Sequence, residues 1–383
     1  MIVMKFGGSV LGSPEGLRRM ARILQERGPE RVIVVVSAMG STTRDLERMA
    51  TLSRDGSASK AMTAADALLA MHQTLVDQTI GDITMRDGLR ALLQETRREL
   101  DALIEGIAIT RQLTPRTLDS VMAIGEILSL HIVRHVLADA GLDACSIDAR
   151  RVLVTDGTYG NASPLPEQTA LRAEHDLRPL LDRYPIVVIQ GFVGRSEDGV
   201  TTTMGKESSN LTAVLLASVL NIHSVMIYTD VPGVRSCDPS ICDATLPRPS
   251  MSYSQARLAA VHGIKVLYPT MIEPAERAGV SITIAAMQEH MTEVTRISAC
   301  GGPCGPIVSG TIHLGSGILT CVFGSVTAWL DAVRAVAEQC SIEQFDVTWS
   351  AADSVGTMTL PERILHQAMI IVHQRLTIHE TRP

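Results

Sequence analysis

Four segments of the chain combine the glycine, lysine and hydroxyl residues that bind anions in proteins. They are KFGGS at residues 5–9, SAMGSTT at 37–43, GFVGRSEDGVTTTMGKESSN at 191–210 and YTDVPGVRSCDP at 228–239. Glycine lets the backbone approach a phosphate closely, and a lysine can place positive charge on a phosphoryl group during transfer. Each segment alone also fits a turn, a helix cap or a surface loop. Together they predict a site for phosphate chemistry.

The elements that must position these segments alternate between strands and helices. Short apolar runs predict buried strands at residues 2–6, 31–37, 185–190 and 224–229. Helical patterns lie at residues 15–27, 44–52, 61–108, 118–140 and 208–219. This alternation predicts a largely parallel sheet with helices on both faces, and ligands bind at the carboxyl ends of such strands. The four segments are therefore expected at the same edge of one sheet.

Composition argues against several classes of partner. The net charge is -7, and aromatic residues make up 3% of the chain, so nucleic acid and anionic membranes are not expected as partners. The N-terminal apolar stretch contains Lys5 and has no basic region before it, so no signal peptide is predicted and a cytoplasmic location is expected. No run approaches the ~20 apolar residues of a membrane span. A length of 383 residues favours two domains.

Other common site types find no support in the sequence. The seven cysteines are expected to be reduced thiols, and their spacing favours ordinary loop cysteines over a zinc site. The chain has no G-x-x-x-x-G-K-[ST] phosphate loop, no G-x-G-x-x-G dinucleotide motif and no G-x-S-x-G motif of serine hydrolases.

In their order and spacing, the segments resemble the signature sequences of aspartate kinases, which are members of the amino acid kinase superfamily. The matching stretches are KFGGSV, VVVSAMGSTT, AIGEILS, DGTYGNASP, VIQGFVGRSEDGVTTTMGKESSN, IYTDVPGV and HGIKVLYPT. The resemblance extends over about residues 1–290. It implies the amino acid kinase fold, an α/β domain of three αβα layers with a mainly parallel sheet.

The resemblance also implies an activity. ATP would phosphorylate the β-carboxylate of L-aspartate, or of a closely related acidic amino acid, with Mg²⁺ held mainly by phosphates and water, and we name no protein metal ligand. Lys5 and Asn210 would be catalytic, and Glu126 would pair with the substrate ammonium group. The other implied substrate residues are Ser37, Thr43, Lys206 and Ser209, and the implied nucleotide residues are Gly7, Gly8, Ser9, Thr229, Asp230, Arg235 and Lys265.

The segment MGKESSN departs from the family pattern, which usually reads LGRGGSD. Lys206 stands in place of an arginine, which keeps the charge but loses bidentate geometry toward a carboxylate. Asn210 stands in place of an aspartate and removes a negative charge near Lys5. Glu207 introduces a charge that is unfavourable beside an anion unless it points away. Arg235 and Ser240 also replace a tyrosine and an arginine that are common in the family.

Two interpretations of these departures compete. The chain is either an active carboxylate kinase, or a catalytically impaired homologue that binds an amino acid or nucleotide and regulates. We favour the kinase because seven family positions persist: Lys5, Gly7, Gly8, Thr43, Glu126, Asp230 and Lys265. A carbamate or N-acetylglutamate kinase fits less well, because AIGEILS and the C-terminal region resemble aspartate kinases.

The C-terminal region resembles part of an ACT domain, a small α+β ligand-binding module. Its pattern predicts a strand at 317–323, a helix at 327–339, strands at 345–349 and 355–360, and a helix at 361–376. We therefore expect a kinase domain over residues 1–295 and a single ACT-like domain over 305–383. A single copy would need a partner chain to complete its sheet, which favours a homodimer. A structural cap that senses nothing is an equal alternative.

Overall fold

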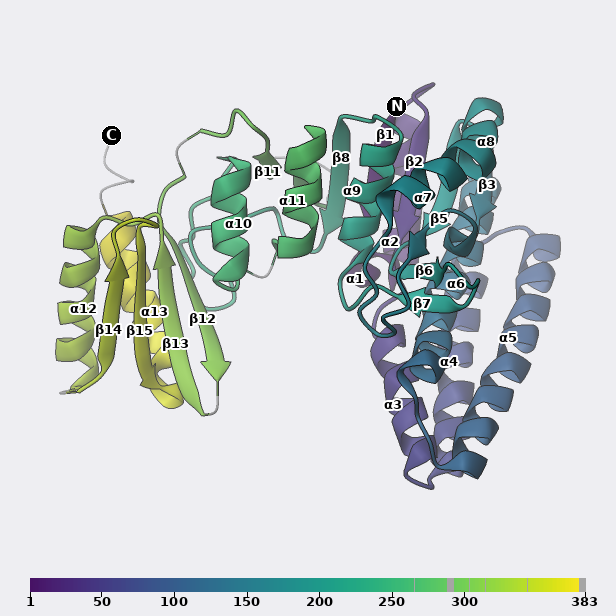
Figure 1. The fold of residues 1–383 in the computed structure, drawn as a ribbon, viewed down its shortest axis with the longest axis horizontal. Coiled ribbons are helices and arrows are strands. Elements are labelled where there is room, and N and C mark those ends of the chain that lie inside the picture. Colours follow the sequence, from purple (N-terminus) through teal and green to yellow (C-terminus); the bar gives the residue numbers. More distant parts are fainter. Residues whose placement is uncertain (265, 288–292, 303, 314, 343, 379–383) are drawn as a thin grey trace. The chain divides into compact units, whose positions relative to one another are not determined.

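The computed structural model describes residues 1–264, 266–287, 293–302, 304–313, 315–342 and 344–378 (Figure 1). It contains two compact units. Unit 1 comprises residues 1–230 together with Met287, and unit 2 comprises residues 231–286 together with the described residues from 293 onwards. The division into domains at residues 1–295 and 305–383 stays a prediction.

The sheet of unit 1 is parallel and almost entirely buried. Its strands are β3 (Ala144–Ile147), β5 (Ile186–Gln190), β2 (Val32–Val36), β1 (Ile2–Phe6) and β8 (Ser224–Thr229), in that order across the sheet. Every residue of β1, β2 and β5 is buried, which explains why these strands are apolar except for Lys5 and Gln190 near their carboxyl ends. The strand β3 was not predicted, because its sequence ACSI is short and its two central residues are half-buried.

Helices pack on this sheet, which confirms the predicted fold of αβα layers with a mainly parallel sheet. The helix α6 (Pro115–Asp139) packs on β2, β3 and β5, and α9 (Ser209–Val219) packs on β1, β2 and β8. By length and composition α6 could cross a membrane, yet most of its apolar stretch is buried inside the protein, as in a core helix. Shorter elements complete this part of the unit: α1 (Gly8–Leu11), α2 (Pro14–Glu26), α7 (Pro166–Arg172), a π-helical turn (Ala173–Leu177) and α8 (Arg178–Arg183).

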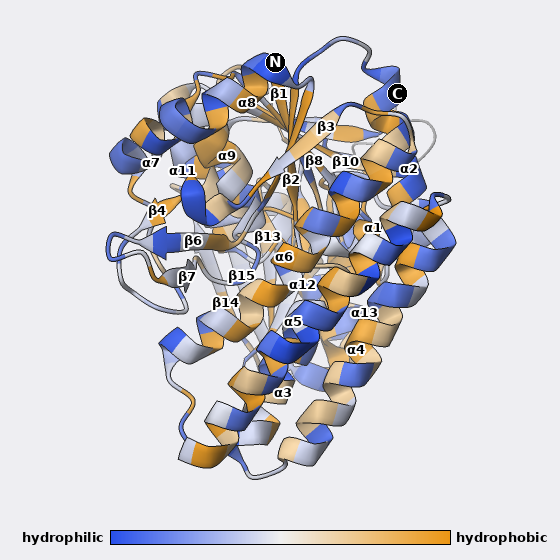
Figure 2. Cartoon of the chain, turned by 90° about the vertical axis from the view of Figure 1, so that its right-hand side faces the viewer, coloured by the Kyte–Doolittle hydropathy of each residue, from blue (hydrophilic) through white to orange (hydrophobic). Residues whose placement is uncertain are grey.

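A helical bundle extends from the sheet. It contains α3 (Thr42–Arg54), α4 (Ala58–Thr79) and α5 (Ile83–Thr110), which pack with α6 around an apolar cluster. Figure 2 shows hydrophobic and hydrophilic residues alternating along α3, α4 and α5, as expected for helices with one buried face. The helical region predicted at 61–108 is helical except at residues 80–82, which separate α4 from α5. The Asp82 side chain accepts the Met85 N–H and caps the start of α5.

A small second sheet of unit 1 lies near the start of α9 in the sequence. It consists of β4 (Val154–Thr155), β6 (Val193–Ser196) and β7 (Thr201–Thr203). The antiparallel pair β6 and β7 folds the Gly191–Asn210 segment back on itself, so that the residues after β7 lead directly into α9.

Unit 2 begins with the loop after β8. Its first elements are β9 (Ser250–Met251), α10 (Tyr253–Val261), α11 (Pro269–Ala278), β10 (Ser281–Ala286) and β11 (Val294–Ile297), and β11 pairs with both β9 and β10. The rest of the unit is an α+β module of β12 (Ile307–His313), β13 (Ser316–Val322), α12 (Val326–Cys340), β14 (Asp346–Ser350), β15 (Val355–Pro361) and α13 (Leu365–Thr377).

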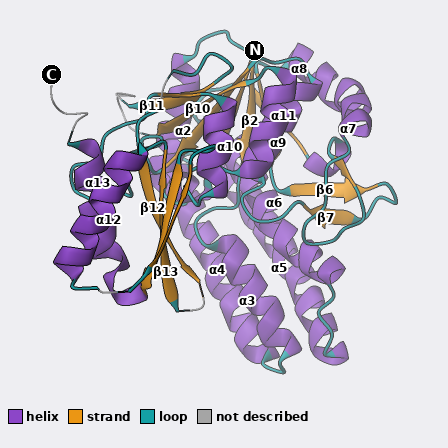
Figure 3. Cartoon of the chain, turned by 60° about the vertical axis from the view of Figure 1, so that its left-hand side comes forward, coloured by secondary structure: helices purple, strands orange, loops and turns teal. Residues whose placement is uncertain are grey.

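The α+β module fits the expected ACT-like fold, with two differences from the prediction. Its antiparallel sheet has the order β12-β13-β15-β14, and Figure 3 shows α12 and α13 beside it. The strand β12 was not predicted, and it supplies a fourth strand from this same chain. A homodimer therefore stays a prediction and no longer follows from an incomplete sheet. The predicted helix at 361–376 begins later, because Pro361 ends β15 and a 3₁₀ turn (Glu362–Ile364) precedes α13.

Candidate active site

Lys5 and two glycines lie where β1 ends. Lys5 is aligned with Val35 of β2 and Ile227 of β8, and its side chain is 9% exposed. The Gly7 N–H donates to the Tyr228 carbonyl at 3.0 Å. A Cβ at Gly8 would lie 2.2 Å from the Ala38 carbonyl oxygen, so only glycine lets the loops after β1 and β2 approach this closely.

The charge state of Lys5 reflects two opposing effects. Burial lowers the pKa of Lys5 to about 8, while the carboxylates of Glu207 and Asp230 act in the opposite direction. Lys5 is therefore mostly protonated at neutral pH. A buried ammonium with weak hydration can stabilise a phosphoryl group more strongly than an exposed one, because water does not screen it.

Glu126 lies on α6 and is 3% exposed. Its Oε1 accepts the Ala38 N–H at 3.3 Å and the Thr43 hydroxyl at 3.5 Å. Its Oε2 is buried without a hydrogen-bond partner among the residues that the structure describes. Burial raises the pKa of Glu126 to about 8, although these hydrogen bonds lower it. The structure thus brings Glu126 and Thr43 together and leaves one carboxyl oxygen for a further partner.

The start of α9 places three polar side chains in the interior. Ser208, Ser209 and Asn210 are buried, and the Ser208 hydroxyl and Asn210 Oδ1 make no hydrogen bond within the described part of the chain. The segment packs closely on the end of β5, since a Cβ at Gly191 would lie 2.5 Å from Ser209 Cβ. These groups are neutral, so they can donate or accept hydrogen bonds without adding charge.

Lys206 and Glu207 lie just before α9 and are exposed. Lys206 Nζ forms an ion pair with Glu47 of α3 at 2.8 Å. Glu207 has a φ of 69°, a left-handed conformation that favours glycine. The negative charge of Glu207 favours the protonated form of Lys5 and so opposes the effect of burial on its pKa.

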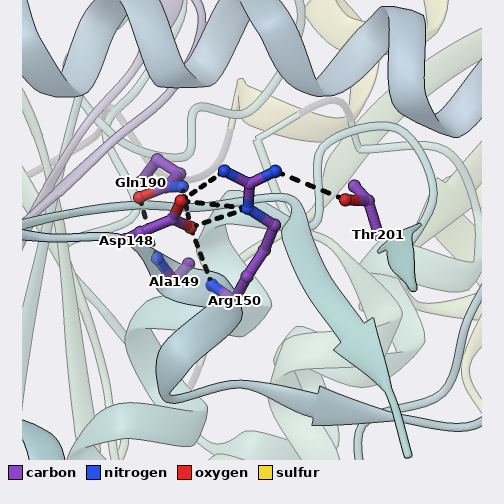
Figure 4. A network of polar contacts seen from close by, with 5 residues as sticks. All are labelled: Asp148, Ala149, Arg150, Gln190 and Thr201. Carbon is purple, nitrogen blue, oxygen red and sulfur yellow. Dashed lines mark hydrogen bonds and ion pairs between the residues drawn. The ribbon is translucent and has the colours of Figure 1, made fainter. Parts of the chain in front are cut away.

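Two polar networks hold the surrounding loops. Figure 4 shows the first, in which Gln190 at the end of β5 accepts the Ala149 N–H at 3.0 Å and donates to Asp148 Oδ1 at 2.8 Å. Asp148 also accepts from Arg150, and these hydrogen bonds hold its pKa below the usual range although burial opposes this. In the second network, buried Asp119 of α6 accepts the N–H and hydroxyl of Thr203 at 2.9 and 2.6 Å, which fixes β7.

The remaining predicted residues of unit 1 are located as follows. The Thr229 hydroxyl donates to Asp230 Oδ1 at 2.9 Å at the end of β8. The Ser37 N–H donates to the Phe6 carbonyl at 3.3 Å, which joins the ends of β1 and β2. Ser9 lies in α1 and is exposed. Unit 1 therefore gathers its predicted residues at the carboxyl ends of β1, β2 and β8 and at the start of α9.

Arg235 and Ser240 belong to unit 2. Arg235 forms an ion pair with Glu293 and donates to the Thr245 hydroxyl at 2.6 Å. It lines a cavity of about 290 Å³ within this unit. The Ser240 hydroxyl donates to Asp238 Oδ1 at 2.7 Å. Lys265 lies outside the described residues.

Sequence reasoning missed several residues that shape the site. Asp119 and Gln190 stand in α6 and β5 without any local motif, so their partners Thr203 and Ala149 become visible only in three dimensions. Glu47 carries no signal beyond its position on a helix. Glu207 was noticed in the sequence, because a charged residue stands where the family pattern has glycine, but its left-handed backbone was not predicted.

Sequence comparison identifies the family. The model of the amino acid kinase family matches residues 1–286. The chain belongs to this family. It is 28% identical over 286 residues to aspartokinase 1, chloroplastic, of Arabidopsis thaliana, a match that covers 74% of this chain and 49% of the relative. It is 27% identical over 289 residues to lysine-sensitive aspartokinase 3 of Escherichia coli, covering 76% of this chain and 62% of the relative.

The chain thus spans about half to two thirds of the length of these curated relatives. Among solved structures, E. coli aspartokinase III in complex with aspartate and ADP is similar, with a TM-score of 0.74 and 23% sequence identity. The match covers 98% of this chain and 84% of that chain. It therefore includes the α+β module as well as the kinase family region, and it supports the fold.

Proposed function

We propose that this protein transfers the γ-phosphoryl group of ATP to the β-carboxylate of L-aspartate or a closely related acidic amino acid. The observation that carries the proposal is Glu126, a buried carboxyl group with one oxygen left unpaired beside Thr43. A buried carboxylate is stable only with a partner of opposite charge or a proton, and an amino acid ammonium group supplies that charge.

Different residues of unit 1 have different roles in the proposed reaction. Glu126 and Thr43 hold the amino acid end of the substrate, with Ser37, Ser209 and Lys206 as further substrate contacts. The β-carboxylate oxygen forms a bond to the γ-phosphorus, and the bond from that phosphorus to the β-γ bridging oxygen breaks, releasing ADP. Lys5 stabilises the charge on the transferring group, and the Asn210 amide can donate a hydrogen bond beside it.

The nucleotide is proposed to bind at the glycine loop and the end of β8. The close approach of the Gly8 backbone to the loop after β2 leaves no room for a side chain there, and backbone N–H groups in such loops suit phosphate oxygens. Within unit 1, Thr229, Asp230 and Ser9 are the further nucleotide residues, whereas the nucleotide roles of Arg235 and Lys265 stay predictions from the family resemblance. Magnesium would neutralise phosphate charge when bound.

Two observations favour a second candidate, a homologue that binds an amino acid or nucleotide without turnover. Lys206 already has a carboxylate partner in Glu47, and the start of α9 is neutral at Asn210. Neither observation changes Glu126, and Lys5 is retained, so we give the kinase precedence. For either candidate we propose a cytoplasmic homodimer whose ACT-like module either binds an effector or serves as a structural cap.

The test is ADP formation with ATP, Mg²⁺ and a series of acidic amino acids, with hydroxylamine present to trap an acyl phosphate as a hydroxamate. We expect aspartyl hydroxamate from the wild-type protein and roughly 10²–10³-fold slower formation from Lys5→Met. Lys60→Met, which removes an exposed lysine on α4, is the matched control and should retain activity. The opposite result is that the protein turns over no acid while aspartate or ATP still raises its melting temperature. That result would overturn the kinase proposal in favour of the binding homologue.

A further inference from the structure

Two buried cysteines lie side by side in the loop that follows β8. The sulfur atoms of Cys237 and Cys242 are 2.8 Å apart, and both residues are 3% exposed. Non-bonded carbon atoms in optimal contact lie about 3.5–4.0 Å apart, and sulfur is larger than carbon. A buried free cysteine usually packs as a small hydrophobic residue, but packing alone does not bring two sulfurs this close. The pair is therefore placed for a reaction between its two thiols.

A tight turn holds the two cysteines together. The N–H groups of Ile241 and Cys242 both donate to the Asp238 carbonyl at 3.0 Å. Asp238 Oδ1 also accepts the Ser240 N–H at 3.0 Å. The sulfurs of a disulfide lie about 2.0 Å apart, so those of Cys237 and Cys242 have to approach by roughly 0.8 Å. The turn has already made most of the approach that a bond between them requires.

The cysteine pair lies where this loop packs on the α+β module of unit 2. Both cysteines belong to the apolar cluster that contains Trp329 of α12. The carbonyl of Ser236, which directly precedes Cys237, accepts the Val308 N–H of β12 at 2.8 Å. Cys237 also lines the cavity of about 290 Å³ that Arg235 lines. A small molecule that enters this cavity can therefore reach one of the two sulfurs.

We propose that Cys237 and Cys242 form a reversible disulfide, which makes this loop a redox modification site for small disulfides such as oxidised glutathione. The thiolate of one cysteine attacks a sulfur of the small disulfide, whose S–S bond breaks and releases one thiol. The thiolate of the other cysteine then attacks the mixed disulfide, so that the Cys237–Cys242 bond forms and the second small thiol leaves. Two cysteines are oxidised, one small disulfide is reduced, and the two cysteine protons pass to the released thiols.

The disulfide would restrict the loop that leads from Arg235 to the module. In the reduced protein this loop is held by hydrogen bonds and apolar contacts, and oxidation would add a covalent link across residues 238–241. Disulfides in reducing compartments are usually transient and catalytic or redox-sensing, as proposed here. The proposal does not depend on the proposed kinase function, because both thiols belong to unit 2 and take no part in the reaction at Lys5.

The test equilibrates the full-length protein in buffers of reduced and oxidised glutathione, quenches it with acid and alkylates the remaining thiols. The tryptic peptide 236–257 contains both cysteines and no other, because trypsin cleaves after Arg235 and Arg257 and not before Pro249. We expect this peptide to lose two hydrogen atoms without gaining glutathione, and dithiothreitol should reverse the change. The equilibrium constant for its oxidation should be at least about tenfold larger in the folded protein than in urea, because the fold holds the two sulfurs together.

Three results would overturn the proposal. The first is a peptide whose cysteines both stay reduced in buffers that add glutathione to the exposed Cys300. The second is a peptide that gains glutathione and forms no internal disulfide, and the third is an equal equilibrium constant in the folded and unfolded protein. Cys340→Ser, which removes a half-buried thiol of α12, is the matched control and should leave the constant unchanged.

A thermal melt tests whether the native loop accepts the bond. The oxidised protein should melt no earlier than the reduced protein, because the link restricts the unfolded chain and needs little movement in the folded one. In Cys242→Ala the same oxidising buffer should leave the melting temperature unchanged. A lower melting temperature of the oxidised wild-type protein, with no such change in Cys242→Ala, would show that the bond distorts the loop and would also overturn the proposal.

Discussion

Glu126 and Lys206 are both proposed to contact the substrate, yet one charged group is buried and the other is exposed to water. Glu126 is buried and bonded to Ala38 and Thr43, so its ionisation depends on what enters the site. Lys206 is exposed and paired with Glu47, where water screens the interaction. The buried group should therefore control affinity strongly, and the exposed group should adjust it weakly.

The largest effect is expected from removing the buried cation. Lys5→Met should lower kcat by roughly 10²–10³-fold, because a preorganised charge on the developing transition state is lost. The melting temperature should not fall, since a buried charge is replaced by an apolar side chain of similar length. The measurement is hydroxamate formation beside a thermal melt. A folded Lys5→Met protein with wild-type kcat would show that Lys5 is not catalytic.

The next largest effect is expected at Glu126. Glu126→Gln removes a buried charge partner worth about 2–3 kcal/mol, so kcat/KM for aspartate should fall by roughly 30–150-fold, mainly through KM. Succinate, which lacks the ammonium group, is the matched substrate control and should be affected far less. Equal losses for both substrates would contradict pairing between Glu126 and the ammonium group.

Glu126 should also make stability depend on pH. Its pKa is raised to about 8 in the folded protein, above the ordinary value of 4.5, so the folded state binds more protons between these pH values. Stability from this group is therefore greatest at low pH and declines as pH rises from about 4.5 to 8. In urea unfolding, the free energy of unfolding of Glu126→Gln should therefore decrease less between pH 4.5 and 8 than that of the wild-type protein. An identical pH slope in wild type and variant would contradict a buried, protonated Glu126.

The smallest effect is expected at the exposed pair. Glu47→Gln should free Lys206 and lower KM for aspartate by about two- to fivefold, because a surface ion pair is worth at most about 1 kcal/mol. Raising the salt concentration should reduce the difference. Glu105→Gln, which removes an exposed charge on α5, is the control. If Lys206→Gln leaves KM for aspartate unchanged, Lys206 does not contact the substrate. Glu126 would then be the only one of these two residues that binds it.

The sequence predicted the parts of the molecule whose signal is local. Short, mainly apolar runs located β1, β2, β5 and β8, and glycine-bearing segments located the ends of these strands. The strand β3 was missed because it is only four residues long and its two central residues are half-buried. The strand β12 was missed because it precedes the segment in which the C-terminal strands and helices were predicted.

The site was predictable to the extent that its residues lie in motifs. Glu126 and Thr43 come from separate segments, and the structure joins them by a hydrogen bond. The left-handed backbone of Glu207 could not be predicted, because a residue with a side chain rarely adopts a positive φ and nothing in the local sequence requires it. Gln190 and Asp119 act through contacts that only tertiary packing creates.

The most direct test of the central claim measures protons released when aspartate binds. Since the pKa of Glu126 is about 8, this carboxyl group is mostly protonated at pH 7 and must ionise to pair with an ammonium group. Calorimetry at pH 7, in two buffers of different ionisation enthalpy, should show release of close to one proton from the wild-type protein and almost none from Glu126→Gln. Equal proton release from both proteins would contradict the assignment of Glu126 as the partner of the substrate ammonium group.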